Sequence, residues 1–264
     1  MIKTLLYVDE DLSSSITLRY AAYLYKLIDM ELYVTHVEEP DPNEQAGTGW
    51  VRRTWENGVA SSGMQLIERM LRTEKIDCPL AGRPKVFVGD KDKEIAYELR
   101  SGGYNLYMEG YLNTADSEAF YQLISSPVYT KAPCPVMVVK NLSLSTRCAL
   151  LCADSVDPQV LVEKTLAIIG DSTLSVDLVF FKFKESESLT FLEKEEAGST
   201  LQQAEKLLEE AGKAPENVTV LLGTPEQVGD HLKDYVFVSS TLPTRKSMRM
   251  ETLANTLSTV MLVR

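Results

Sequence analysis

The sequence predicts an α/β protein of two similar halves in tandem, each a doubly wound domain with a five-stranded parallel sheet. The first observation is the apolar stretch Ile2–Val8, which ends at Asp9 and precedes a Ser-rich turn and a helical pattern. A stretch that is apolar at nearly every position is typical of a parallel strand buried on both faces. The second observation is that the same order returns at Arg147–Ala153 and Asp154. The third is that strand and helix patterns alternate through both halves, which favours parallel sheets covered by helices.

In the first half, five predicted strands alternate with helices. Between Leu12 and Ile28, apolar residues recur at the spacing of a helix that packs on a sheet. The stretch Trp50–Trp55 alternates aromatic and basic residues. We interpret it as a helix start whose rings lie on the sheet, the alternative being a surface for single-stranded nucleic acid. The predicted strands are Ile2–Val8, Glu31–Val37, Lys85–Val88, Asn105–Met108 and Val136–Lys140, and the later helices begin near Asp90 and Asp116.

The second half repeats this order over a shorter length. Pro158 fits the first position of a helix capped by Asp157. The turn and cap at Gly223–Thr224 repeat those at Gly89–Asp90, and Lys182–Ser199 is expected to be a charged, mobile connection. The predicted strands are Arg147–Ala153, Ser175–Phe181, Asn217–Leu222, Tyr235–Val238 and Val260–Val263, and the later helices include Leu201–Ala211 and Lys246–Thr256.

A short polar linker, Asn141–Thr146, separates the two halves. We expect two separate sheets on either side of it, with domains at residues 1–141 and 146–264. The closing strands Val136–Val139 and Val260–Val263 are apolar at successive positions, so neither is expected to remain an open sheet edge. We therefore expect these two strands to pair within the chain and to join the halves.

The composition excludes several classes of function. The chain of 264 residues carries a net charge of −11, which argues against binding to nucleic acid or to an anionic membrane surface. Its first apolar stretch enters an acidic turn without a signal-peptide pattern, so we expect a cytoplasmic protein. The four cysteines form no CxxC pair and are interpreted as reduced core thiols. Only His36 and His231 are available for a zinc site or a histidine-based triad, and we expect neither.

The chain resembles the universal stress protein family in its tandem form, with one Rossmann-like domain in each half. In the first half, the resemblance is carried by the strand that ends at Asp9, by the turn Val88–Asp90 and most specifically by the closing segment Ala132–Val139. In the second half it is carried by Asp154 and Tyr235–Ser240, although the Ala-Pro-Cys-Pro lead of the closing strand is missing there. The resemblance implies a regulatory or stress-response protein.

Nucleotide-binding members of that family carry a glycine-rich loop after the fourth strand, where backbone N–H groups at a helix start cradle phosphate. The first half keeps only Gly110 of this loop, beside Glu109, whose carboxylate would repel phosphate. The second half has no glycine at the corresponding place. We therefore expect ATP to bind weakly or not at all to the first half.

If either half binds a nucleotide or another anion, we expect it to be the second. Its hydroxyl groups and basic side chains could hold an anion at a helix start, while a carboxylate at the strand end meets a ribose or a base. A capped and solvated helix start is the alternative interpretation of the same residues. The candidate residues are Asp154, Ser239, Ser240, Thr241, Arg245 and Lys246, with Asp9 and Gly110 in the first half.

The sequence favours a non-enzymatic regulatory protein that acts through protein contacts, self-association or a weakly bound ligand, without an obligatory cofactor. The alternative is a sensor that binds ATP or AMP through a degenerate phosphate loop. An enzyme of the same superfold is a third hypothesis. The sequence weighs against it because no motif assembles a nucleophile, a base and an oxyanion site.

Overall fold

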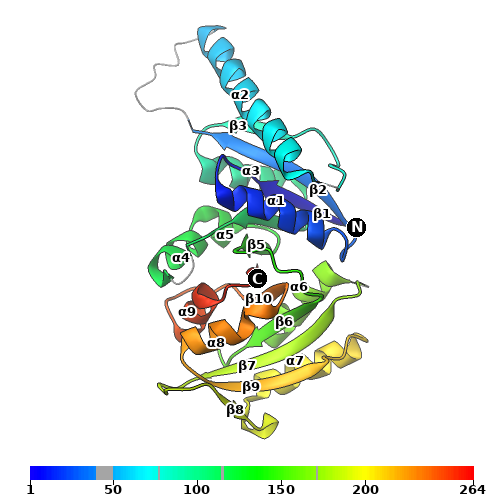
Figure 1. Ribbon diagram of the computed structural model, residues 1–264, viewed down its shortest axis with the longest axis vertical. Helices are drawn as coiled ribbons and strands as arrows, with labels where there is room; N and C mark the ends of the chain where they lie inside the picture. Colours follow the sequence, from blue (N-terminus) through cyan, green and yellow to red (C-terminus); the bar gives the residue numbers. More distant parts are fainter. Residues whose placement is uncertain (40–49, 77, 114–115, 171) are drawn as a thin grey trace.

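A computed structural model describes residues 1–39, 50–76, 78–113, 116–170 and 172–264, apart from the side chain of Val51. The described residues form one continuous sheet of eleven strands, in the order β3-β2-β1-β4-β5-β11-β10-β6-β7-β9-β8. In Figure 1 the first half lies above the second, and the C-terminus lies where the halves meet.

In the first half, strands and helices alternate as predicted. The strands are β1 (Ile2–Tyr7), β2 (Met30–Glu38), β3 (Lys85–Val88), β4 (Leu106–Gly110) and β5 (Val136–Val139), and the helices are α1 (Leu12–Leu24), α2 (Trp50–Glu74), α3 (Lys91–Gly102), α4 (Ser117–Ile124) and α5 (Pro127–Lys131). Helix α2 extends beyond the body of the first half (Figure 1). The expectation that its first aromatic ring lies on the sheet is wrong, because Trp50 is 78% exposed.

The second half repeats the order of the five parallel strands and adds one strand. The strands are β6 (Arg147–Cys152), β7 (Ser175–Phe183), β8 (Thr190–Leu192), β9 (Asn217–Gly223), β10 (Phe237–Thr241) and β11 (Thr259–Val263), and the helices are α6 (Pro158–Ile169), α7 (Ser199–Glu210), α8 (Pro225–His231) and α9 (Met248–Asn255), with short 3₁₀ turns η1 (Lys194–Glu196) and η2 (Leu232–Asp234). The addition is β8, an antiparallel edge strand on β9, within a segment expected to be only a mobile connection.

Each half contributes five parallel strands in the same spatial order, with the first strand of the half at the centre. The predicted pairing of the closing strands is confirmed, because β5 and β11 lie side by side and antiparallel. The expectation of two separate sheets is wrong, because this pairing merges them into one. The two predictions could not both hold: strands that remove each other's open edge also fuse their sheets.

Helices cover both faces of the sheet, and the core has two corresponding layers. On one face, α1, α2, α6 and α7 pack through side chains such as Leu18, Ile67, Leu161 and Leu201. On the other face, α3, α4, α5, α8 and α9 pack through side chains such as Ile95, Phe120, Val228 and Met250. The carboxyl ends of the strands in each half are therefore flanked by helix starts from both faces, which is where α/β proteins place ligands.

Candidate ligand site in the second half

A hollow of about 460 Å³ lies at the carboxyl ends of β6, β7 and β9. One part of its wall is apolar and includes Phe181, Phe183 and Leu222. Phe183 is 50% exposed, so the apolar wall is open to solvent and can receive a flat ring. The full lining is Ala153, Asp154, Ser155, Phe181, Lys182, Phe183, Leu222, Ser247, Met248 and Arg249.

A second, polar hollow of about 340 Å³ adjoins the first. It is lined by Ser155, Pro243, Thr244, Arg245, Ser247 and Arg249. Three of these residues, Ser155, Ser247 and Arg249, line both hollows. The site therefore has an apolar part and a polar part, with Arg249 between them.

Arg249 is a buried cation, only 8% exposed. Its Nη1 donates to the Ser240 hydroxyl over 3.0 Å and to the backbone carbonyl of Thr241. Its Nε has no hydrogen-bond partner, and no carboxylate lies within ion-pair distance of the guanidinium in the part of the chain that the structure describes. Burial lowers the pKa of Arg249 to about 10, so the side chain is still charged at neutral pH. A buried charge without a counter-charge is costly, and an anion in the polar hollow would remove that cost.

The start of α9 adds to the positive character of this place. Ser247 caps the helix through its hydroxyl, which accepts from the backbone N–H of Met250. The N-terminus of a helix carries a partial positive charge and free N–H groups. Arg249 lies in the first turn of the same helix. The guanidinium and the helix start thus both favour an anion.

Asp154 also lines the first hollow and is exposed. Its carboxylate rests against Gly198, which precedes α7. A Cβ at that position would come within 2.7 Å of Asp154 Oδ1. The glycine therefore leaves room for the carboxylate at the rim. An exposed carboxylate in this place can accept hydrogen bonds from the hydroxyl groups of a ligand.

The other predicted residues of the second half divide into two groups. Arg245 is exposed and lines the polar hollow. Ser239 and Ser240 are fully buried beneath the site instead. The Ser239 hydroxyl is hydrogen-bonded to Thr165 over 2.7 Å, and the Ser240 hydroxyl donates to the backbone carbonyl of Leu151. Neither serine lines a hollow, so the structure does not bring their hydroxyl groups to a ligand.

Thr241 and Lys246 also differ from the predicted arrangement. Thr241 offers its backbone carbonyl to Arg249 and lines neither hollow. The Lys246 ammonium forms an ion pair with Glu118 of α4 and lies 5.4 Å from the centre of the Tyr121 ring, so it reaches across to the first half. The predicted basic pair is thus split: Arg245 remains at the site and Lys246 does not.

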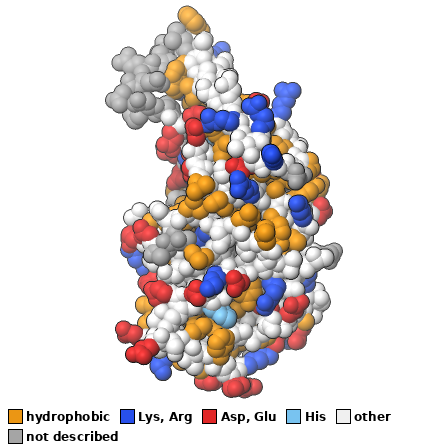
Figure 2. All heavy atoms as spheres, in the orientation of Figure 1, with side chains coloured by type: hydrophobic (Ala, Val, Ile, Leu, Met, Phe, Trp, Pro, Cys, Tyr) orange, Lys and Arg blue, Asp and Glu red, His pale blue; other side chains and the backbone are white. Residues whose placement is uncertain are grey.

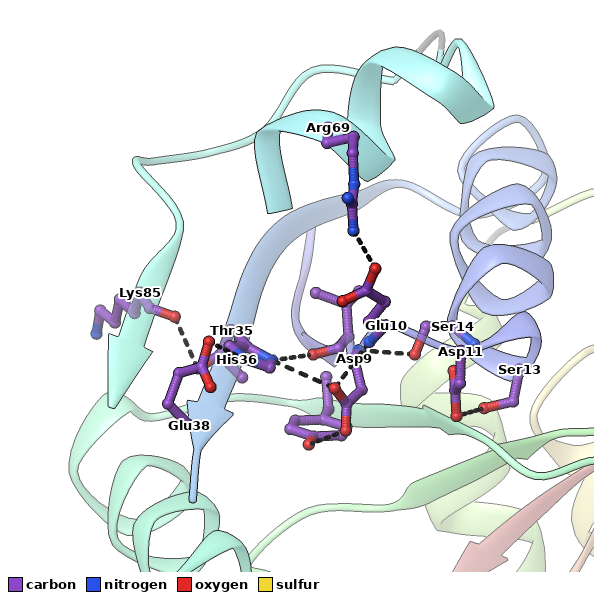
Figure 3. Close-up of polar contacts among 12 residues, drawn as sticks. Asp9, Glu10, Asp11, Ser13, Ser14, Thr35, His36, Glu38, Arg69 and Lys85 are labelled. Carbon is purple, nitrogen blue, oxygen red and sulfur yellow. Dashed lines mark hydrogen bonds and ion pairs between the residues drawn. The ribbon is translucent and has the colours of Figure 1, made fainter. Parts of the chain in front are cut away.

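The first half has a hollow of about 480 Å³ near the corresponding strand ends. Its lining mixes Glu10, Glu38 and Glu68 with Arg69 and Arg72, and Glu10 is paired with Arg69. Figure 3 shows Glu10 pointing toward Arg69 of α2, with His36 between Asp9 and Glu38. His36 Nδ1 lies 2.8 Å from the Val8 carbonyl. The Asp9 carboxylate accepts from the Tyr7 hydroxyl over 3.2 Å and from the backbone N–H of Glu10 over 2.7 Å. These acidic groups are engaged with the protein's own donors.

The strand register shows which residues of the two halves correspond. The closing strands pair about Met137 and Met261, so these two methionines are equivalent. They lie beside Met108 and Ser239, which in turn lie beside Leu6 and Leu150. Counted from Leu6 and Leu150, the residue equivalent to Asp154 is Glu10. The predicted equivalence of Asp9 with Asp154 is therefore wrong by one residue.

Gly110 and Glu109 do not form a phosphate loop. A Cβ on Gly110 would lie 2.4 Å from the backbone oxygen of Ser13, so the glycine allows α1 to approach β4. The Glu109 carboxylate is buried. It accepts from Lys91 over 2.9 Å and from the hydroxyl groups of Tyr107 and Tyr129. The Glu109 carboxylate is therefore neutralised by these partners, and it does not line the hollow of the first half.

Sequence analysis missed Arg249, Ser247 and the apolar wall. The sequence carries only a weak signal for Arg249, which shares a helix face with Thr252 and Thr256. The structure shows that this polar face is buried, because both threonines are fully buried. Phe181 was expected to end a strand and Phe183 to lie in the charged connection Lys182–Ser199, whereas β7 continues to Phe183.

Among the described residues, no group of three or more histidine, cysteine, aspartate or glutamate side chains is arranged to hold a metal ion. The helices described by the structure include none with the length and hydropathy needed to cross a bilayer. Acidic and basic side chains are mixed on the face drawn in Figure 2.

Comparison with known proteins places the fold. No protein-family model matches the chain, and no curated protein matches it. A solved universal stress protein from Archaeoglobus fulgidus matches 99% of this chain and 95% of its own, with a TM-score of 0.58 and 15% identity. A functionally unknown protein from Pseudomonas aeruginosa PAO1 matches 99% of this chain and 92% of its own, with a TM-score of 0.54 and 14% identity.

A shorter match covers about half of the chain. A universal stress protein family protein from Arabidopsis thaliana, solved with AMP bound, matches 53% of this chain and 92% of its own, with a TM-score of 0.33 and 14% identity. The full-length match to the archaeal protein fits the repeated strand order of the two halves. The chain therefore has the fold of the tandem universal stress proteins, as its sequence resemblance implied.

Proposed function

We propose that this protein is a non-enzymatic regulator that senses a nucleoside monophosphate such as AMP through its second half. The observation that carries the proposal is Arg249, a guanidinium that is 8% exposed, lines both hollows and lacks a partner for Nε. A buried cation that opens into a hollow without a protein counter-charge favours a small anion.

The remaining lining suits the other parts of a nucleotide. The wall formed by Phe181, Phe183 and Leu222 offers an apolar surface for a base. The Asp154 carboxylate can accept from ribose hydroxyl groups. Arg245 and Arg249 both line the polar hollow, where two guanidinium groups would balance a phosphate dianion.

The chemistry of the lining supports binding without turnover. The residues that line the two hollows include no histidine and no cysteine. Two serines, Ser155 and Ser247, have no neighbouring general base in that lining apart from the Asp154 carboxylate. The hydroxyl of Ser247 is already occupied as the cap of α9. A ligand held here meets groups that orient it and none paired to attack it.

Titration calorimetry with AMP tests the proposal on the intact chain. A charge-assisted contact contributes on the order of 1.5–3 kcal/mol, so Arg249→Met should weaken AMP binding by about tenfold or more. Arg245→Met should weaken it less, because that side chain is exposed. Lys164→Met, which changes an exposed lysine on α6, is the matched control and should alter the affinity little.

Incubation of AMP and ATP with the protein, followed by chromatography, tests the absence of turnover. Unchanged nucleotides are the expected result. AMP affinity that does not respond to Arg249→Met would contradict the assignment of the site, and steady consumption of either nucleotide would contradict a non-enzymatic role.

A further inference from the structure

Helix α9, which carries Arg249, is held at its C-terminal end by the first half. Lys140 follows β5 and is buried, with 3% of its surface exposed. Its Nζ donates to the backbone carbonyls of Leu253, Ala254 and Thr256 over 2.6, 2.8 and 3.1 Å. An ammonium has three N–H groups, and here each meets a carbonyl that the end of a helix leaves free. The side chain also lies 4.6 Å from the centre of the Phe120 ring.

The other end of α9 also contacts the first half. Lys246, two residues before the helix, pairs with Glu118 and lies over the Tyr121 ring, both on α4. This contact is exposed at both partners and is therefore the weaker of the two. Helix α9 is eight residues long, about 12 Å at the rise of an α-helix, so both ends and the Arg249 turn move together.

A reciprocal contact shows that these cations belong to the junction between the halves. Arg264 stands in the second half where Lys140 stands in the first, one residue beyond the closing strand. Its Nη1 donates to the backbone carbonyl of Thr130 in α5. Each half thus sends a cation from the end of its closing strand to a helix carbonyl of the other half. The first half makes the more buried of the two contacts.

We infer that Lys140 is a positioning residue for the anion site of the second half: by seating the C-terminal end of α9, it sets where Arg249 meets the phosphate of the ligand. The inference rests on the proposed function for the identity of the ligand. It assigns to the first half the task of setting the affinity of the second. No contact between Lys140 and the ligand is involved.

The experiment compares AMP with adenosine, which lacks the phosphate, in the full chain. Lys140→Met should weaken AMP binding by about fivefold or more and leave adenosine within twofold, because only the phosphate contact depends on Arg249. Lys140→Arg keeps a charged donor but cannot place three N–H groups in the same way, so its effect should be smaller. Lys164→Met, an exposed lysine on α6, is the matched control and should change neither affinity.

A ligand-free measurement separates this inference from the proposed function. In Lys140→Met, hydrogen exchange of the α9 amides should speed up and the Arg249 Nε resonance should shift. Lys140→Arg should show smaller changes of the same kind, and it replaces Lys140→Met as the test if that variant does not fold. If these changes appear but no variant binds AMP, the proposed function fails and the positioning role stands. Equal weakening of AMP and adenosine, or an unchanged α9 and Arg249 resonance in the folded variants, would overturn the inference.

Discussion

Met137 of β5 lies directly opposite Met261 of β11, at the centre of the antiparallel pair that joins the two halves. Both side chains are fully buried, and the neighbouring pairs are symmetric about them: Val138 with Val260 and Val136 with Leu262. The pair therefore marks a local two-fold relation between the closing strands. Each strand contributes an apolar edge that the other covers, as dimers of separate domains would do between chains.

Deletion of Val260–Arg264 tests the importance of this junction. Strand β11 lies between β5 and β10, so its removal exposes two apolar strand edges in the middle of the sheet. We expect the shortened chain to be insoluble or to form new oligomers, measured by size-exclusion chromatography. A truncated chain that stays monomeric, with an unchanged melting temperature, would contradict this role of β11.

Gly110 is expected to matter for packing and not for ligand binding. In Gly110→Ala the new Cβ would lie 2.4 Å from the backbone oxygen of Ser13, so α1 must move away from β4. We expect a loss of about 1–3 kcal/mol in the free energy of unfolding, measured with urea. Gly58→Ala is the control: it adds a Cβ in open space on α2 and should be neutral or stabilising. A Gly110→Ala variant as stable as the original chain would contradict the close approach.

The positions of most strands along the chain could be predicted because they depend on local patterns. The apolar runs that end near Asp9 and Asp154 and the closing strand Val136–Val139 are readable within a few residues. Register is not local, because the equivalence of Asp154 with Glu10 depends on five successive strand pairings. The repeated sequence motif therefore suggested Asp9 as the counterpart of Asp154 in place of Glu10, although the predicted class of fold was correct.

The candidate site could be predicted only in part, for the same reason. Arg245 and Asp154 line the hollows as expected. The direction of Lys246 is set by Glu118, 128 residues earlier in the chain, and no local pattern contains that information. The role of Arg249 depends on how α9 is rotated against the sheet, which is a matter of tertiary packing. Basic residues could be found from the sequence, but not which of them was buried without a counter-charge.

Glu109 and Lys91 are expected to be strongly coupled. Burial acts to lower the pKa of Lys91, but the charge and hydrogen bond of Glu109 outweigh it and hold that pKa above its usual value. Glu109→Gln removes the counter-charge and puts an amide among three donors, so we expect a loss of about 3 kcal/mol in the free energy of unfolding. The double variant with Lys91→Met should lose less than the sum of the two single changes. Additive losses would show that the two charges act independently.

Lys140 should give the stability of the protein a specific dependence on pH. Burial lowers the pKa of Lys140 to about 7, from an ordinary value of 10.5. Between these two pH values the unfolded chain holds a proton that the native chain has released, so the free energy of unfolding rises with pH. The slope is at most about 1.4 kcal/mol per pH unit, and it falls to zero below pH 7, where both states are protonated.

Other groups also titrate, so the comparison is with Lys140→Met, which lacks this proton. The difference in unfolding free energy between the original chain and Lys140→Met, measured with urea from pH 6 to 9, should be flat below 7 and increase in favour of the original chain above it. A difference that stays constant or falls over pH 7–9 would mean that Lys140 keeps its proton, with its three carbonyl contacts outweighing the cost of burial.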